Sequence, residues 1–316
     1  MPDSKGFLWF CTSDGLTRFD GSHFVNFGAS QGAPYTSTND LLELPGGDYW
    51  IATNGEGVVR FRVAGDLQPV TGASTRARFT PYRISPDAAA NRVNSLYRDR
   101  AGTIWLGTDG GLYRLMERNG AVAIEAVPLG LPNHPDVTVQ VWATIEDAEG
   151  SIWAGTRFGV WRGLPDGRRI SYPIQPSATT DHVFSLLLDE ASRIWIAQQS
   201  GVVVWRPPAL ATMDAAAPQF REDHSLADTV RRGQARGPRT LPEKPGEVRF
   251  FSIGPAASGQ GVRSMHRISS GGLYIGTRLG NVYEFGLGGD RPIATGEPFS
   301  GDVILTIGED STGDLW

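Results

Sequence analysis

A tryptophan-centred phrase recurs along this chain and constrains its fold more than any other feature. The full copies read LWFCTSDGL, YWIATNGEGV, IWLGTDGGLYRL, IWAGTRFGVW, IWIAQQSGVVVW and LYIGTRLGNVYEF, and a further copy begins in GDLW. Their aromatic anchors are Trp9, Trp50, Trp105, Trp153, Trp195, Tyr274 and Trp316. A period of about 40 to 50 residues is typical of a four-stranded propeller blade. The sequence therefore predicts an all-β fold, a β-propeller of four-stranded blades.

The anchor spacing predicts the number and completeness of the blades. Successive anchors are 41, 55, 48, 42, 79 and 42 residues apart. Seven anchors predict about seven blades in a single domain over residues 1–316, incomplete at both termini. The two long intervals require insertions, one near residues 63–78 and one over 206–247. The second is rich in Ala, Pro and Arg, so we expect a surface excursion between the third and fourth strands of the fifth blade.

A turn precedes each anchor and has its own chemistry. Asp stands six residues before the anchor at Asp3, Asp99, Asp147, Asp189 and Asp310, and Gly stands three before it at Gly6, Gly47, Gly102, Gly150, Gly271 and Gly313. Asp at the first position and Gly at the fourth favour a type I turn. Calcium binding is the alternative, but no dense D-x-D-x-D-G loop accompanies these residues.

The anchor ring and the residues just after it predict packing between blades. The residue two positions later is small, as Cys11, Ala52, Gly107, Gly155, Ala197 or Gly276, and would let the adjacent sheet approach. Cys11, the only cysteine, is therefore predicted to be a small core residue.

Composition and motif searches exclude several functional classes. Hydrophobic residues make up 40% and charged residues 20%, and the net charge of −5 offers no broad basic face to nucleic acid. No apolar run of membrane-spanning length and no signal peptide is present. Nucleophile elbows, HExxH, paired CxxC and P-loop patterns are absent, and the five histidines lack metal-ligand spacing. We therefore predict no catalytic residue, no metal and no cofactor in this segment.

Three segments carry a resemblance to a known family. DSKGFLWFCTSDGLTRFDGSHF, DRAGTIWLGTDGGLYRL and DAEGSIWAGTRFGVWR resemble two-component regulator propeller repeats. The resemblance implies an extracytoplasmic, periplasmic sensor of an inner-membrane protein, which binds a small molecule and passes the signal to a downstream histidine kinase. It implies oligosaccharides among the candidate ligands and a homodimer of the full-length sensor. Contact with the membrane would come only through sequence outside this segment.

Comparison of the blades with one another predicts where a ligand binds. Twelve residues before the anchor the innermost strand is always aliphatic from the third blade onward, at Val93, Val141, Val183, Val262 and Ile304. The positions on either side vary and are predicted to face the other way by period-two alternation. The candidate ligand-binding residues are Arg92, Asn94, Gln140, Trp142, His182, Phe184 and Arg263. The aromatic members suit a sugar ring, and Arg92 and Arg263 suit carboxylate or sulfate groups.

Four alternatives remain open at this stage, and one of them, implied by the family resemblance, is ligand binding at a propeller edge or between protomers. In another, the varied residues form only the solvated rim of the propeller's central channel and bind no ligand. In another the propeller is a scaffold that dimerises without binding a ligand. The remote enzymatic alternative is a propeller lyase of the antibiotic-inactivating kind.

Overall fold

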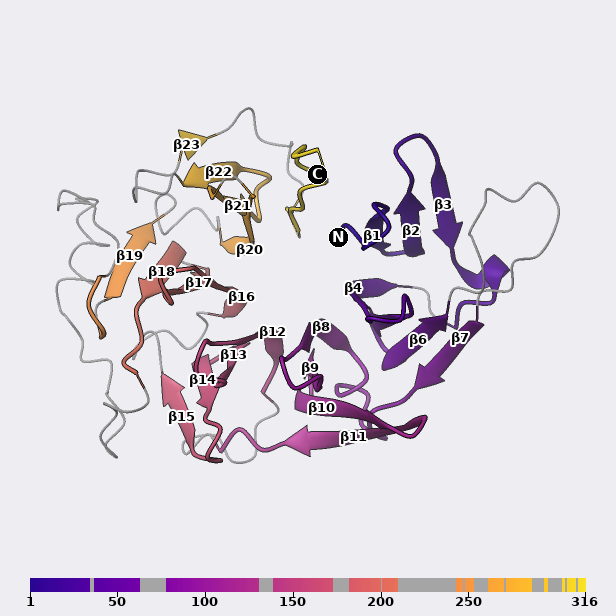
Figure 1. The fold of residues 1–316 in the computed structure, drawn as a ribbon, viewed down its shortest axis with the longest axis horizontal. Coiled ribbons are helices and arrows are strands. Elements are labelled where there is room, and N and C mark those ends of the chain that lie inside the picture. Colours follow the sequence, from indigo (N-terminus) through magenta and orange to yellow (C-terminus); the bar gives the residue numbers. More distant parts are fainter. Residues whose placement is uncertain are drawn as a thin grey trace. The chain divides into compact units, whose positions relative to one another are not determined.

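The computed structural model describes residues 1–34, 37–62, 78–130, 139–172, 182–199, 201–209, 243–246, 248–252, 261–269, 271–285, 293–294, 303–304, 306–310 and 312–316. Within these ranges the chain forms antiparallel sheets of three or four strands and one short 3-10 helix, Ala29–Gln31 (Figure 1). The chain divides into two compact units, residues 1–144 with 309–314 and residues 145–308 with 315–316. Among the described residues, no helix has the length and apolarity to span a membrane.

The first unit contains three complete sheets. One has the order β1 (Leu8–Thr12), β2 (Gly15–Phe19), β3 (Phe24–Phe27). The next has the order β4 (Thr38–Glu43), β5 (Tyr49–Thr53), β6 (Val58–Arg62), β7 (Arg78–Tyr82). The third has the order β8 (Val93–Arg98), β9 (Ile104–Thr108), β10 (Gly111–Arg118), β11 (Ala121–Val127).

The remaining sheets repeat this sequential antiparallel order. β12 (Val141–Glu146) leads the sheet that continues with β13 (Ile152–Thr156), β14 (Gly159–Gly163) and β15 (Arg169–Tyr172). β16 (Val183–Leu188), β17 (Ile194–Gln198), β18 (Gly201–Trp205) and β19 (Val248–Ser252) form the next. The sixth contains β20 (Val262–Arg267), β21 (Leu273–Thr277), β22 (Val282–Phe285) and β23 (Ile293–Ala294).

The two predicted insertions fall largely outside the described residues. β18 pairs with β19 from Trp205↔Val248 to Gly201↔Ser252, so the segment 206–247 connects the third and fourth strands of that sheet. Its interior, residues 210–242, and the smaller excursion, residues 63–77, lie outside the described ranges. Seven blades, a single domain and incompleteness at the termini stay predictions.

The anchor rings of Trp9 and Trp153 pack between neighbouring sheets, as predicted. Trp9 on β1 lies 5.1 Å from the Tyr49 ring on β5 and 6.0 Å from the Phe61 ring on β6, measured between centroids. Trp153 on β13 contacts Trp205 on β18 at 5.3 Å. Each ring therefore leaves its own sheet to fill the space against the next one, which removes a large apolar area from water.

The small residue two positions after the anchor is explained by the same sheet contact. A Cβ on Gly155 would lie 2.6 Å from Cγ1 of Val183, on the inner strand of the following sheet. A Cβ on Gly107 would lie 3.1 Å from Cγ1 of Val141 and 2.5 Å from Oγ of Ser95. The inner-strand valines therefore occupy the space that a larger side chain would need.

The turns have the predicted geometry, and their aspartates do more than predicted. Gly102 donates its N–H to the Asp99 carbonyl at 3.0 Å with a φ of 89°, and the other Asp–Gly turns repeat this bond. The Asp99 carboxylate accepts the Thr103 amide at 2.8 Å and the Trp105 indole N–H at 2.8 Å. The same indole bond joins Asp3 to Trp9, Asp147 to Trp153 and Asp189 to Trp195. The carboxylates therefore accept donors of their own repeat, and that of Asp3 also accepts the Tyr49 hydroxyl of the next sheet at 2.7 Å.

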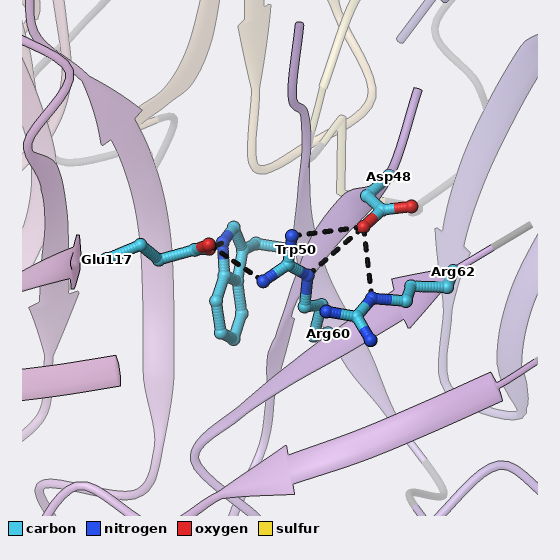
Figure 2. Close-up of polar contacts among 5 residues, drawn as sticks. All are labelled: Asp48, Trp50, Arg60, Arg62 and Glu117. Atoms are coloured by element: carbon cyan, nitrogen blue, oxygen red, sulfur yellow. Dashed lines mark hydrogen bonds and ion pairs between the residues drawn. The ribbon is translucent and has the colours of Figure 1, made fainter. Parts of the chain in front are cut away.

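The second sheet satisfies its indole in another way. Leu44 occupies the position six residues before the anchor, where four of the other turns have the accepting Asp. The Trp50 indole N–H donates instead to Glu117 on β10 of the neighbouring sheet, at 3.1 Å (Figure 2). Arg60, opposite Trp50 on β6, bridges Glu117 at 2.7 Å and Asp48 at 3.0 Å. Asp48 also accepts from Arg62 at 3.2 Å. An acid from the next sheet thus replaces the missing aspartate of the turn.

Candidate functional site

The inner strands share a feature that the alternation argument missed. Val93, Val141, Val183 and Val262 are fully buried, as predicted. Immediately after three of them the strand register shifts, between Val93 and Ser95, between Val183 and Ser185, and between Val262 and Ser264. Asn94, Phe184 and Arg263 are therefore bulge residues, and strict period-two alternation is wrong at this point. Bulges re-aim a side chain and are common beside functional sites.

In the first unit two candidate residues converge on one carboxylate. The Asn94 Nδ2 donates to Oδ1 of Asp109 at 3.0 Å, and Arg92 Nη1 lies 3.9 Å from Oδ2 of Asp109. Asn94 also donates to the Val141 carbonyl at 3.1 Å, just as Asn39 of the second sheet donates to the Val93 carbonyl at 2.7 Å. Asn94 thus links adjacent inner strands, while Arg92 is exposed and has a counter-charge.

In the second unit three candidate residues form one contact group. The His182 and Phe184 rings pack edge to face with centroids 5.6 Å apart. The guanidinium carbon of Arg263 lies 4.3 Å from the centroid of the Phe184 ring. Arg263 is half-buried, and burial, followed by the charge of Arg278, lowers its pKa from the ordinary arginine value. The structure therefore brings together His182, which directly precedes β16, Phe184 on β16 and Arg263 on β20.

The other two candidate residues lie at the start of β12. Gln140 directly precedes this strand, Trp142 is its second residue, and both are half-buried. They belong to the first unit, whereas His182, Phe184 and Arg263 belong to the second. Ligand binding by any of the seven residues remains a prediction.

A further set of variable residues was missed by the sequence reasoning. These residues lie four positions after the anchors, at the turn between the second and third strands. They are Asn54, Asp109, Arg157, Gln199 and Arg278. Asp109 contacts both Arg92 and Asn94, and the Arg278 amide donates to the Gly261 carbonyl at 3.0 Å. A usable signal was present, because these positions change from sheet to sheet as much as the bulge positions do.

Asp40 on β4 is another residue that the sequence did not indicate as functional. The equivalent inner-strand residues of the next four sheets are Ser95, Ala143, Ser185 and Ser264. Its carboxylate accepts the Leu96 amide of β8 and the amide of Leu41, both at 2.8 Å. Burial raises the pKa of Asp40 to about 6 against the opposing effect of these two hydrogen bonds. Burial above all, and then the charge on Asp40, raise the pKa of the Cys11 thiol to about 12, so this thiol stays protonated at neutral pH.

Asp40 makes the stability of the first unit depend on pH. Because its folded pKa lies above the unfolded value, the folded state holds the proton more tightly, and its contribution to stability is lost as pH rises from about 4 to about 6. A shift of about two units corresponds to about 2 to 3 kcal/mol. Asp40→Asn retains an acceptor for the Leu96 amide, so we expect it to flatten this part of the pH dependence, measured by denaturant unfolding at pH 4, 5, 6 and 7.

The control for this prediction is Asp14→Asn, at an exposed carboxylate of the same unit. It should leave the difference in unfolding free energy between pH 4 and pH 7 unchanged. If Asp40→Asn has the same pH profile as the wild-type chain, the carboxylate does not titrate in this window.

The described residues contain no group of three or more His, Cys, Asp or Glu side chains placed to hold a metal ion. The turn aspartates, which a calcium hypothesis would use, accept indole and amide N–H groups instead.

Comparison with known proteins assigns the class. The chain is similar to a solved structure of streptogramin B lyase, at 12% identity over 100% of this chain and 87% of that chain, with a TM-score of 0.67. It is also similar to the β-propeller domain of Cps50 (Swd1) from Myceliophteria thermophila, at 14% identity over 98% and 86% of the two chains, with a TM-score of 0.58. The protein is therefore an all-β propeller, and these likenesses concern its fold.

The sequence match is narrower and more specific. Residues 88–110 match the family model described as two component regulator propeller. This segment spans β8 and β9 and includes Arg92, Asn94 and Asp109. The resemblance to such repeats is confirmed there. A search of curated proteins gave no significant match.

A third comparison concerns an extracellular domain assigned to a hybrid two component system of B. thetaiotaomicron. The identity is 19% and the TM-score is 0.41. The whole of this chain aligns with 48% of that domain, so it spans about half of its length.

Proposed function

We propose that this chain is the ligand-recognising propeller of a two-component signalling protein. The observation that carries the proposal is the match of residues 88–110 to the two component regulator propeller model. The same arrangement of turn, anchor and small residue recurs in the other sheets, which extends the likeness beyond the matched segment. We further propose an extracytoplasmic location, a homodimer and a downstream histidine kinase, as the family resemblance implies.

Recognition of a small molecule is supported by the contrast between the two sets of inner-strand residues. The buried valines perform one repeated packing task, whereas the bulge residues and the residues four after the anchors vary between sheets in charge, size and polarity. A surface with uniform scaffolding and varied aromatic and charged residues suits a ligand site better than a bare scaffold does. Sugars are the proposed ligand class, because aromatic rings and hydrogen-bonding groups both occur among these varied residues.

The proposal is tested in the native host by an in-frame deletion of residues 1–316 from the full reading frame. We expect the deletion to abolish a transcriptional response to a carbon source while the full-length control restores it. An alkaline phosphatase fusion placed directly after residue 316 should be active if the chain is extracytoplasmic. An unchanged transcriptional response would contradict the sensing role, and an inactive phosphatase would contradict the location.

The scaffold alternative predicts another result. A scaffold that only dimerises would retain the response when Phe184 is replaced by Ala, provided that the dimer is intact. The likeness to streptogramin B lyase is one of fold, at 12% identity.

A further inference from the structure

The arginines on or beside the inner strands differ in whether a carboxylate lies near them. Arg92 in the first unit lies 3.9 Å from Asp109. Arg267, three residues after the end of the bulge on β20, lies 2.9 Å from Glu190. Arg263 and Arg278 have no carboxylate partner among the residues that the structure describes, although Arg263 is half-buried. Within the described part of the chain, these two guanidinium groups of one sheet, at the same end of their strands, therefore face no carboxylate.

The position of Arg263 is set by its neighbours. As the bulge residue between Val262 and Ser264, its side chain is directed by the irregular backbone onto the Phe184 ring, 4.3 Å from the centroid. The His182 ring supports Phe184 from the edge at 5.6 Å. A guanidinium stacked on an aromatic face keeps its N–H groups free to donate at its rim, so this packing orders the group without using its donors.

Arg278 is held close to Arg263 by the backbone. Its amide donates to the Gly261 carbonyl at 3.0 Å, and a Cβ on Gly261 would lie 3.5 Å from the Arg278 Cδ. Burial, and after it the charge of Arg278, lowers the pKa of Arg263, in keeping with this backbone proximity. Two like charges near one another, one of them half-buried, repel in the free protein, and an anion between them would relieve the repulsion.

We propose that Arg263 and Arg278, with Phe184 beside them, form a binding site for a small organic anion that carries a carboxylate or sulfate group. The guanidinium groups would bind the oxyanion through charge-assisted hydrogen bonds, which are stronger and more directional with Arg than with Lys. The Phe184 and His182 rings would contact the organic part. The proposal rests on the proposed function and specifies the class of its ligand.

The test uses D-glucuronate as the probe and D-glucose as its uncharged counterpart, titrated into the 15N-labelled chain at low ionic strength. Binding is followed by the Nε–Hε resonances of arginine. We expect saturable shifts with glucuronate and none with glucose. Arg263→Gln and Arg278→Gln should each weaken binding by about tenfold, which is the effect of losing one charged hydrogen bond. Arg278 is exposed, so its variant is expected to fold normally.

Arg168→Gln is the matched control, because it removes one positive charge from an exposed Arg168–Asp166 pair of the same unit. It should leave the affinity unchanged. Equal weakening by all three variants would show attraction by net charge alone and would overturn the site. If glucose binds as tightly as glucuronate, the site does not require an anion. If inorganic sulfate binds as tightly as glucuronate, the site does not recognise the organic part of the ligand. Either result would overturn the proposal of an organic anion site. No binding of glucuronate with the host response intact would refute this inference and leave the sensing role standing.

Discussion

Replacing Asp147 by Ala is expected to lower the free energy of unfolding by about 3 to 5 kcal/mol, because it leaves a buried charge without its main partner. Arg162 on β14 is fully buried, and its Nη2 donates to Asp147 at 2.8 Å. The same carboxylate accepts the Trp153 indole N–H and the Ser151 amide. Glu149, 3.2 Å from Arg162, would compensate only in part. Guanidinium chloride unfolding followed by tryptophan fluorescence measures the loss.

Asp99→Ala is the matched control for this substitution. Asp99 makes the same turn and accepts the Trp105 indole, but the arginine opposite Trp105 is Arg114, which pairs with the exposed Glu125 instead. Asp99→Ala should lower the free energy of unfolding by about 1 to 2 kcal/mol, because it removes these hydrogen bonds. If Asp147→Ala and Asp99→Ala lower stability equally, the buried ion pair contributes nothing beyond the turn.

Gly57→Ala is expected to destabilise the first unit by about 3 kcal/mol or more, because strain and steric overlap act together. The φ of Gly57 is +78°, a conformation that L residues rarely adopt. A Cβ there would collide with the Tyr82 carbonyl oxygen and lie 3.2 Å from the Asn91 Oδ1. Gly57 also donates to the Asn91 carbonyl at 2.9 Å, so the change would disturb the loop that leads into Arg92.

Gly120→Ala separates the two effects. Its φ is +79°, and a Cβ there meets nothing within 4 Å, so it should lose only the conformational part, about 1 kcal/mol. Thermal unfolding of both variants is the measurement. If Gly57→Ala unfolds at the same temperature as Gly120→Ala, the loop of residues 83–91 moves to accommodate the added methyl group without loss of stability.

The candidate site was predictable only in part. Inner-strand valines were identified by their recurrence, and the bulge positions were identified as variable. Nothing local to Asn94 or Arg263 distinguishes them, yet Asn94 donates to a backbone carbonyl of the next inner strand and Arg263 has no carboxylate among its described neighbours. Arg278 and Asp109 were missed because their contacts, with Gly261 and with Asn94 respectively, arise only when the turn between the second and third strands meets the start of the inner strand.

The sequence by itself determined the all-β class, the phase of the strands and the turn before each anchor. These features repeat, and they depend on residues within a few positions of one another, such as the Asp and Gly that flank each turn. Only the tertiary structure decided which charged side chains form ion pairs and which carboxylate accepts the hydrogen bond of an indole N–H. Trp50 and Glu117 are 67 residues apart, and Gly155 meets Val183 of the next sheet. Such contacts join residues of different repeats, where no periodic pattern specifies the partner and packing between sheets selects it.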